Sequence, residues 1–158
     1  MTDKEEFPPL LEPGFHVMTL AELRSRCVSV FPLSTSRAQI MDGLEKFVDM
    51  LRSEGIVGDL WIDGSFMTQK LDPEDVDVVL SVQASLYESG TVAQQKILDL
   101  VCVADFKSDY FCDPYVLWQY SEDDALYATG EWLRAYWIKQ FGFSRGIDMK
   151  GMALIQLR

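Results

Sequence analysis

The sequence is poor in the residues that bind soft metals or cross membranes. It has one histidine, His16, and three cysteines without a CxxC spacing, Cys27, Cys102 and Cys112. A metal site built from thiolates and imidazoles is therefore not expected, and the odd cysteine count favours reduced thiols in a cytoplasmic protein. No apolar run approaches the roughly 20 residues that a transmembrane helix needs, so no membrane partner is expected.

Basic residues are also scarce. The chain has 14 lysines and arginines against 25 aspartates and glutamates, a formal net charge of −11 at pH 7. This sign repels a phosphate backbone, so a long nucleic acid is not an expected partner. The charge is uneven, because residues 99–131 include eight acids and one lysine, whereas residues 134–158 include five bases and one aspartate. The C-terminal segment could therefore meet an anion, although solvated helix faces account for most of these charges.

The remaining composition is that of one globular domain. The 158 residues are 48% hydrophobic and 25% charged, which predicts a single domain over residues 1–158 with an irregular lead-in at 1–15. Capping boxes, apolar periodicity and alternation predict the following elements: helices starting at 20, over 36–51, over 91–103 and over 121–141, and strands over 60–63, 75–82, 109–118 and 152–157. This order predicts a mixed α+β (mixed α/β) domain.

A carboxylate pair opens the second predicted strand. The alternation of Asp75-Val76-Asp77 places both aspartates on the same side of the strand. Two such charges repel each other unless a positive group lies between them. Magnesium takes one or two carboxylates together with substrate phosphates, so this pair is a candidate metal site. The alternative is an exposed edge face whose charge prevents aggregation.

A Gly64-Ser65 pair follows the first predicted strand. Backbone amides and a hydroxyl at such a turn can point at an anion, and Lys70 in the same loop offers a positive charge for phosphate. Each feature alone has a simpler interpretation, since Gly-Ser is a common turn and a loop lysine is usually solvated. A phosphate-binding site is favoured only by their combination with the aspartate pair about ten residues later.

That combination resembles the signature of the DNA polymerase β-type nucleotidyltransferase superfamily. The resemblance implies a palm-like mixed sheet flanked by helices. It also implies that Gly64 and Ser65 hold a nucleoside triphosphate such as ATP, that Asp75 and Asp77 bind two Mg²⁺ ions, and that a later strand supplies a third carboxylate. The string Asp63–Lys70 with Pro73 is similar to that of small uncharacterised nucleotidyltransferase-like bacterial proteins. Two further segments extend the similarity over most of the chain, Glu12 to His16 and Arg145 to Gly151.

The third carboxylate is expected on the strand predicted over 109–118. Asp109 and Asp113 would share one face of it. Asp113 fits the family pattern best and Asp109 is the reserve candidate, although Pro114 restricts this strand to an edge or a bulge. Arg145 and Lys150, in the loop before the last strand, are candidates for contacts to the nucleotide phosphates.

Several functions follow from the resemblance. The favoured one is a minimal magnesium-dependent nucleotidyltransferase that transfers AMP from ATP to a protein or small-molecule hydroxyl. Small members resemble the antitoxin partners of toxin–antitoxin pairs, which makes a toxin a candidate protein partner. The alternative is a catalytically silent binding module that neutralises a protein partner. A sugar-phosphate or antibiotic nucleotidyltransferase is a further possibility, and a lone chain would have to dimerise to build its acceptor site.

Aromatic residues recur along the helix predicted over 121–141. They are Trp132, Tyr136, Trp137 and Phe141. Such a band could stack on a base, but an aromatic stripe at helical spacing is more often part of the core. The sequence therefore predicts that this band is buried.

Overall fold

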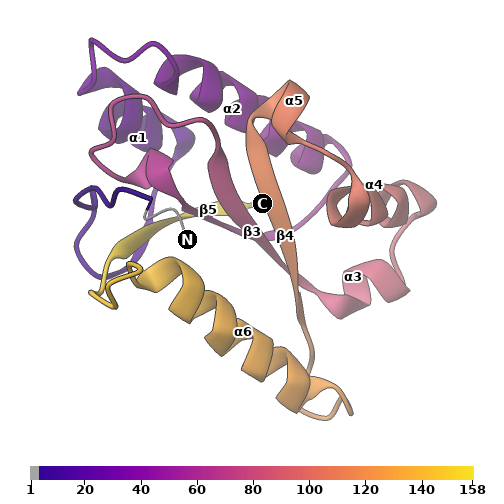
Figure 1. The fold of residues 1–158 in the computed structure, drawn as a ribbon. Coiled ribbons are helices and arrows are strands. Elements are labelled where there is room, and N and C mark those ends of the chain that lie inside the picture. Colours follow the sequence, from indigo (N-terminus) through magenta and orange to yellow (C-terminus); the bar gives the residue numbers. More distant parts are fainter. Residues whose placement is uncertain (1–3) are drawn as a thin grey trace.

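The computed structural model describes residues 4–158. It confirms a mixed α+β domain, in which helices flank one five-stranded sheet (Figure 1). The strands are β1 (Gly14–Val17), β2 (Gly58–Asp63), β3 (Val76–Gln83), β4 (Cys112–Gln119) and β5 (Gly151–Leu157). Their order across the sheet is β1-β5-β2-β3-β4. β2 runs antiparallel to β3 and β5, whereas the outer pairs β1·β5 and β3·β4 are parallel.

Helices cover both faces of this sheet. They are α1 (Leu20–Arg24), α2 (Arg37–Ser53), α3 (Ala84–Glu88), α4 (Val92–Val103), α5 (Lys107–Tyr110) and α6 (Tyr127–Gly142), with a π-helical turn at Ser25–Ser29 and a 3-10 turn at Ser65–Met67. α2 lies over one face and α6 over the other (Figure 1). Within residues 4–158, no helix is both long and apolar enough to cross a membrane.

The main core lies between the sheet and α2. The apolar stripe predicted for this helix is buried as expected, at Ile40, Leu44, Phe47, Val48 and Leu51. A smaller cluster fills the other face, where Phe141 of α6 packs with Trp61, Val79, Leu117 and Met152. The sheet is therefore apolar on both sides through its middle, and its polar residues gather at the ends of its strands.

Two predictions about the N-terminal half have opposite outcomes. The capping box is confirmed, because the Thr19 hydroxyl accepts a hydrogen bond from the Glu22 amide and the Glu22 carboxylate accepts one from the Thr19 amide. The prediction of an irregular lead-in through residue 15 was wrong at its end, where β1 begins at Gly14 and pairs with β5. Four residues at a sheet edge are too few to show a periodic pattern.

Two predictions about the C-terminal half were wrong at their boundaries. The strand expected from Asp109 begins at Cys112, because residues 107–110 form α5 and Phe111 ends that helix in the left-handed conformation (φ 53°). The helix expected from Ser121 begins at Tyr127, because Ser121 and Asp124 close a turn instead. There the Asp124 carboxylate accepts a hydrogen bond from the Leu126 amide. β4 is an edge strand, which accommodates Pro114 as anticipated.

Candidate functional site

Three aspartates lie in one row across the sheet. In the antiparallel β2·β3 pair Asp63 is opposite Asp77, and in the parallel β3·β4 pair Asp77 is opposite Asp113. Residues directly opposite each other share a face of the sheet, with Cβ atoms about 5 Å apart. This is the face that α6 partly covers, since Trp61 and Val79 follow the same alternation. Asp75, one residue before β3, joins the row through a lysine.

Lys107 holds two of the carboxylates together. Its Nζ lies 3.0 Å from Asp75 Oδ2 and 3.1 Å from Asp113 Oδ2. Hydrogen bonds to the two carboxylates raise the pKa of Lys107 well above its usual value, so the amine stays charged. The Asp105 carboxylate accepts hydrogen bonds from the Lys107 amide and the Ser108 hydroxyl at the start of α5. A positive group therefore already lies between two of the predicted metal ligands. Sequence analysis did not predict this role for Lys107.

Asp77 is a largely buried carboxylate with acids on two sides. Burial and, after it, the negative charges of Asp75 and Asp113 together raise its pKa to about 6. Lys107 and Lys150 oppose this shift only in part. The ionised form of Asp77 therefore lacks compensating positive charge, which a bound cation would supply.

The Gly64-Ser65 turn lies directly against Asp77. Gly64 has a φ of +83°, and a Cβ atom built on it would lie 2.3 Å from Asp77 Oδ2 and 3.2 Å from the Asp77 amide nitrogen. Ser65 then starts a 3-10 turn, in which its carbonyl accepts hydrogen bonds from the Thr68 amide and hydroxyl. Glycine is required here twice over, for its positive φ and for this close approach. The two halves of the sequence motif therefore meet in space.

Substituting Gly64 tests this contact. We expect Gly64→Ala to lower the free energy of unfolding by about 2–4 kcal/mol, because the methyl group meets Asp77 and the backbone conformation disfavours a side chain. The matched control is Gly146→Ala, since a Cβ there meets no atom closer than 3.6 Å. Urea unfolding followed by circular dichroism measures both. Equal stability of the two variants would contradict the close approach of the turn to Asp77.

Lys150 forms a buried ion pair with Asp63, the aspartate of the row that lies on β2. Its Nζ lies 2.7 Å from Asp63 Oδ2, while Asp63 Oδ1 is buried and has no hydrogen-bond partner among residues 4–158. Burial raises the pKa of Asp63 to about 6, and the lysine opposes that rise. Lys150 was predicted to contact nucleotide phosphates. The structure places it at the site, with its ammonium group bound to Asp63.

The other predicted residues lie at different places. Lys70 is half-buried in the loop after the 3-10 turn, and Arg145 is exposed between α6 and β5. Among residues 4–158, no ion pair joins either side chain to the aspartate row. Asp109, the reserve third carboxylate, is exposed in α5 rather than on a strand. The prediction that Asp109 shares a strand face with Asp113 was wrong, because residues 107–110 form α5 and Phe111 breaks the alternation.

A buried arginine that sequence analysis missed fixes the loop next to the site. Arg37 is fully buried at the start of α2, and its guanidinium donates to the carbonyl oxygens of Cys27, Phe66, Thr68 and Lys70. It also stacks on Phe31, with its central carbon 3.8 Å from the ring centroid. Three of the four carbonyls belong to the segment that follows Gly64-Ser65. Arg37 therefore determines the shape of the turn from inside the protein.

The donor set suits a hard cation, but it is not assembled around one. Carboxylate oxygens are the ligands that Mg²⁺ prefers, and Asp75, Asp77 and Asp113 supply several of them. Within residues 4–158, no three acidic, histidine or cysteine side chains are arranged to hold a metal ion. Lys107 instead neutralises two of them. Binding of a divalent cation would therefore require the Lys107 ammonium to move away and the carboxylates to turn toward one point.

The raised pKa of Asp77 makes stability depend on pH. A carboxylate with a folded pKa of about 6, against about 3.9 unfolded, binds its proton more tightly in the folded state. The stability gained from this tighter proton binding is fully present below about pH 4 and is lost as the pH rises through about 6. Without divalent cations, we therefore expect Asp77→Asn to be more stable than wild type at pH 7.5, by about 1–2 kcal/mol. Asp109→Asn is the control, and unfolding curves from pH 4 to 7.5 provide the measurement. A variant no more stable than wild type at pH 7.5 would contradict the shift.

The fold and this geometry define an α+β domain with an acidic site at the strand ends of a mixed sheet. A family model described as "Family of unknown function (DUF6932)" matches residues 5–156. The chain therefore belongs to that family. No curated protein and no solved structure matches the chain.

Proposed function

We propose that the protein is a magnesium-dependent nucleotidyltransferase that transfers AMP from ATP to a hydroxyl of a protein or small molecule. One observation carries the proposal: the Gly64-Ser65 turn contacts Asp77, which lies level with Asp113 and next to Asp75. An anion-binding turn and three carboxylates on one face are what a triphosphate with its metal ions requires.

Each residue of the site has a proposed role. Gly64 and Ser65 would hold the triphosphate, while Asp75, Asp77 and Asp113 would hold two Mg²⁺ ions. When bound, these ions would neutralise the triphosphate and make an attacking hydroxyl more acidic. The hydroxyl oxygen forms a bond to the α-phosphorus as the bond to the β-phosphate oxygen breaks. Pyrophosphate leaves, and the hydroxyl proton passes to a carboxylate of the row. Asp113 is the proposed proton acceptor, because it lies on β4 at the open edge of the sheet.

The lysines and Arg145 take secondary roles in this proposal. Lys70 and Arg145 could reach phosphate groups only from outside the aspartate row, and Lys150 only after leaving Asp63. The net charge of −11 disfavours a long nucleic acid as the acceptor, because the acceptor would have to approach an acidic surface. A protein or a small hydroxylated molecule fits this surface better.

A second candidate function has its own supporting observation. Lys107 forms ion pairs with both Asp75 and Asp113, as a structural ion-pair network would. A catalytically silent module that binds and neutralises a protein partner, such as a toxin, needs no more than that. The two candidates differ in whether a metal and ATP displace the lysine.

Labelled ATP distinguishes the candidates. The purified protein is incubated with magnesium and either α-³²P-ATP or γ-³²P-ATP, alone and with the total protein and metabolite extract of its native cells. We expect stable label on a product only from the α position, since a kinase would transfer the γ label instead. When magnesium is chelated, we expect no such labelling. No product from any of the four nucleoside triphosphates would overturn the transferase and leave the silent module.

A further inference from the structure

α6 carries a largely apolar face that the rest of residues 4–158 leaves uncovered. The predicted burial of its aromatic band is wrong in part, because Trp132 is 74% exposed and Tyr136 is 45% exposed, whereas Phe141 is buried. Four residues of α6 with the helical spacing of 4, 3 and 4 lie along one side, opposite the buried Gly130 and Phe141, and the extended residue Phe143 follows the end of the helix. Together these residues are Ala128, Trp132, Ala135, Lys139 and Phe143, which we call the outer stripe.

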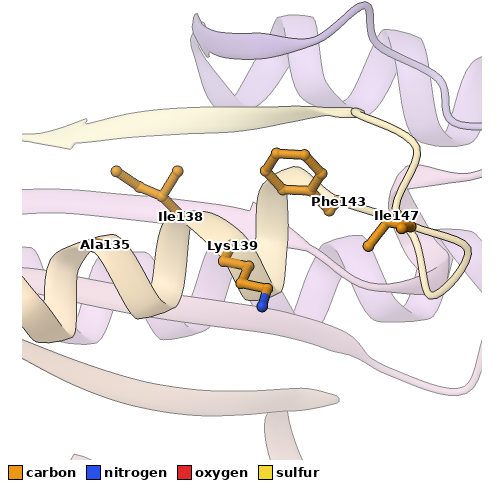
Figure 2. A pocket seen from close by; sticks show the side chains of 5 residues that line it. All are labelled: Ala135, Ile138, Lys139, Phe143 and Ile147. Carbon is orange, nitrogen blue, oxygen red and sulfur yellow. The ribbon is translucent and has the colours of Figure 1, made fainter.

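The outer stripe has both a projection and a hollow. Trp132 projects next to two alanines, while a shallow pocket of about 400 Å³ lies toward the C-terminal end of the helix. Figure 2 shows this pocket, lined by Ala135, Ile138 and Lys139 of α6 and by Phe143 and Ile147 after it. Ile147 is 76% exposed. A large aromatic side chain from another molecule would fill this hollow and cover these apolar atoms.

We propose that the outer stripe binds the same stripe of a second copy of this chain, with the two helices antiparallel. The numbering of the stripe supports this occupant. With a two-fold axis between Ala135 and Tyr136, Trp132 of each copy faces Lys139 at the pocket of the other, and Ala128 lies toward the end of the partner helix that Phe143 follows. Each large side chain then meets a small one or the pocket, and each Trp132 ring meets an ammonium group, a favourable cation–π pair. The surface is therefore complementary to itself, as an isologous dimer requires.

The charge along this segment matches the same arrangement. Residues 121–131 include four acids and no base, whereas residues 132–145 include three bases and no acid. In the antiparallel pair each acidic end lies on the basic end of the other copy. The helix dipole also favours acids first and bases last, but it does not account for the exposed Trp132.

The proposed dimer face borders the acidic site through a chain of aromatic contacts. Tyr136 packs on Trp137 (ring centroids 5.2 Å), Trp137 packs on Tyr115 (4.6 Å), and the Tyr115 hydroxyl lies 3.3 Å from Asp113 Oδ2. The second copy would therefore add a wall beside the site. The dimer itself does not depend on the proposed nucleotidyl transfer.

Sedimentation velocity of the full chain tests the dimer. With a chain mass of 18.0 kDa, we expect a species of twice that mass at 1–100 μM. Trp132→Glu should be monomeric over this range, a weakening of at least about 100-fold. Val103→Glu is the matched control, because Val103 is 83% exposed on α4 and lies outside the stripe. It should dimerise like wild type. Circular dichroism verifies that both variants fold.

Cysteine cross-linking tests the antiparallel orientation. In a Cys102→Ser background, which removes the exposed native thiol, Ala135→Cys should form a disulfide-linked dimer upon oxidation. Ala128→Cys should not, because the two copies of position 128 lie 15 residues apart along the pair, about 22 Å. Three results would overturn the proposal: a monomer at every concentration, a dimer that Trp132→Glu leaves intact, or equal cross-linking at both positions.

Discussion

Asp77→Asn is expected to reduce nucleotidyl transfer from ATP on the order of 10³-fold, equivalent to about 4 kcal/mol of transition-state stabilisation. The same variant should fold normally and be more stable at neutral pH. The reason is that Asp77 is the central carboxylate of the row. Gly64, in the turn after β2, approaches it from one side, and Asp113 lies opposite it on β4. An amide keeps its size but removes the charge that a cation needs. The α-labelled ATP assay measures the effect.

Two further variants make this prediction specific. Asp113→Asn should be impaired to a similar degree, because Asp113 lies directly opposite Asp77 in the β3·β4 pair and would hold the same ions. Asp109→Asn should behave like wild type, since Asp109 is exposed in α5, four residues before Asp113. The opposite order, with Asp109→Asn inactive and Asp113→Asn active, would contradict the assignment of the third carboxylate. Full activity of Asp77→Asn would contradict the site as a whole.

Arg37→Met is expected to lower the free energy of unfolding by about 3–5 kcal/mol. A fully buried arginine normally pairs with a carboxylate, but the guanidinium of Arg37 is bound by four backbone carbonyls. Methionine fills a similar volume and donates no hydrogen bond, so buried carbonyls of the segment after Gly64-Ser65 would lose their donor. Burial lowers the pKa of Arg37, in line with the energetic cost of keeping its charge inside.

Arg52→Met provides the control for this variant. Arg52 lies at the other end of α2 and donates one exposed hydrogen bond, to the Gln156 carbonyl, so its loss should cost less than about 1 kcal/mol. Urea unfolding followed by circular dichroism measures both variants, and Arg37→Lys serves if Arg37→Met does not fold. A loss below about 1 kcal/mol for Arg37→Met would show that water or a rearranged loop replaces the guanidinium.

The elements with strong local signals could be predicted from the sequence. The Thr19 capping box, the apolar stripe of α2 and the alternation around Asp75 and Asp77 each depend on residues a few positions apart, which one chain segment reveals. The boundary of β4 could not be placed in this way. It depends on Phe111 adopting a left-handed conformation, and the Asp105 cap before α5 was the only nearby signal.

The row of aspartates required the three-dimensional structure. The register that places Asp63, Asp77 and Asp113 level depends on how β2, β3 and β4 pair over some 50 residues, which local alternation does not reveal. Lys107 could be recognised as part of the row only after α5 was known. Arg37 and Trp132 depart from the usual burial of their residue types, since the arginine is inside and the tryptophan is outside.

Calorimetric titration of ATP into the protein, with and without magnesium, tests the central claim most directly. The same titration is made into the double variant Asp75→Ala/Asp77→Ala, with Asp109→Asn as the matched control. Binding that requires magnesium, persists in the control and is lost in the double variant is the predicted result. If none of the four nucleoside triphosphates binds wild-type protein in the presence of magnesium, the nucleotidyltransferase proposal is wrong and the fold serves protein contact alone.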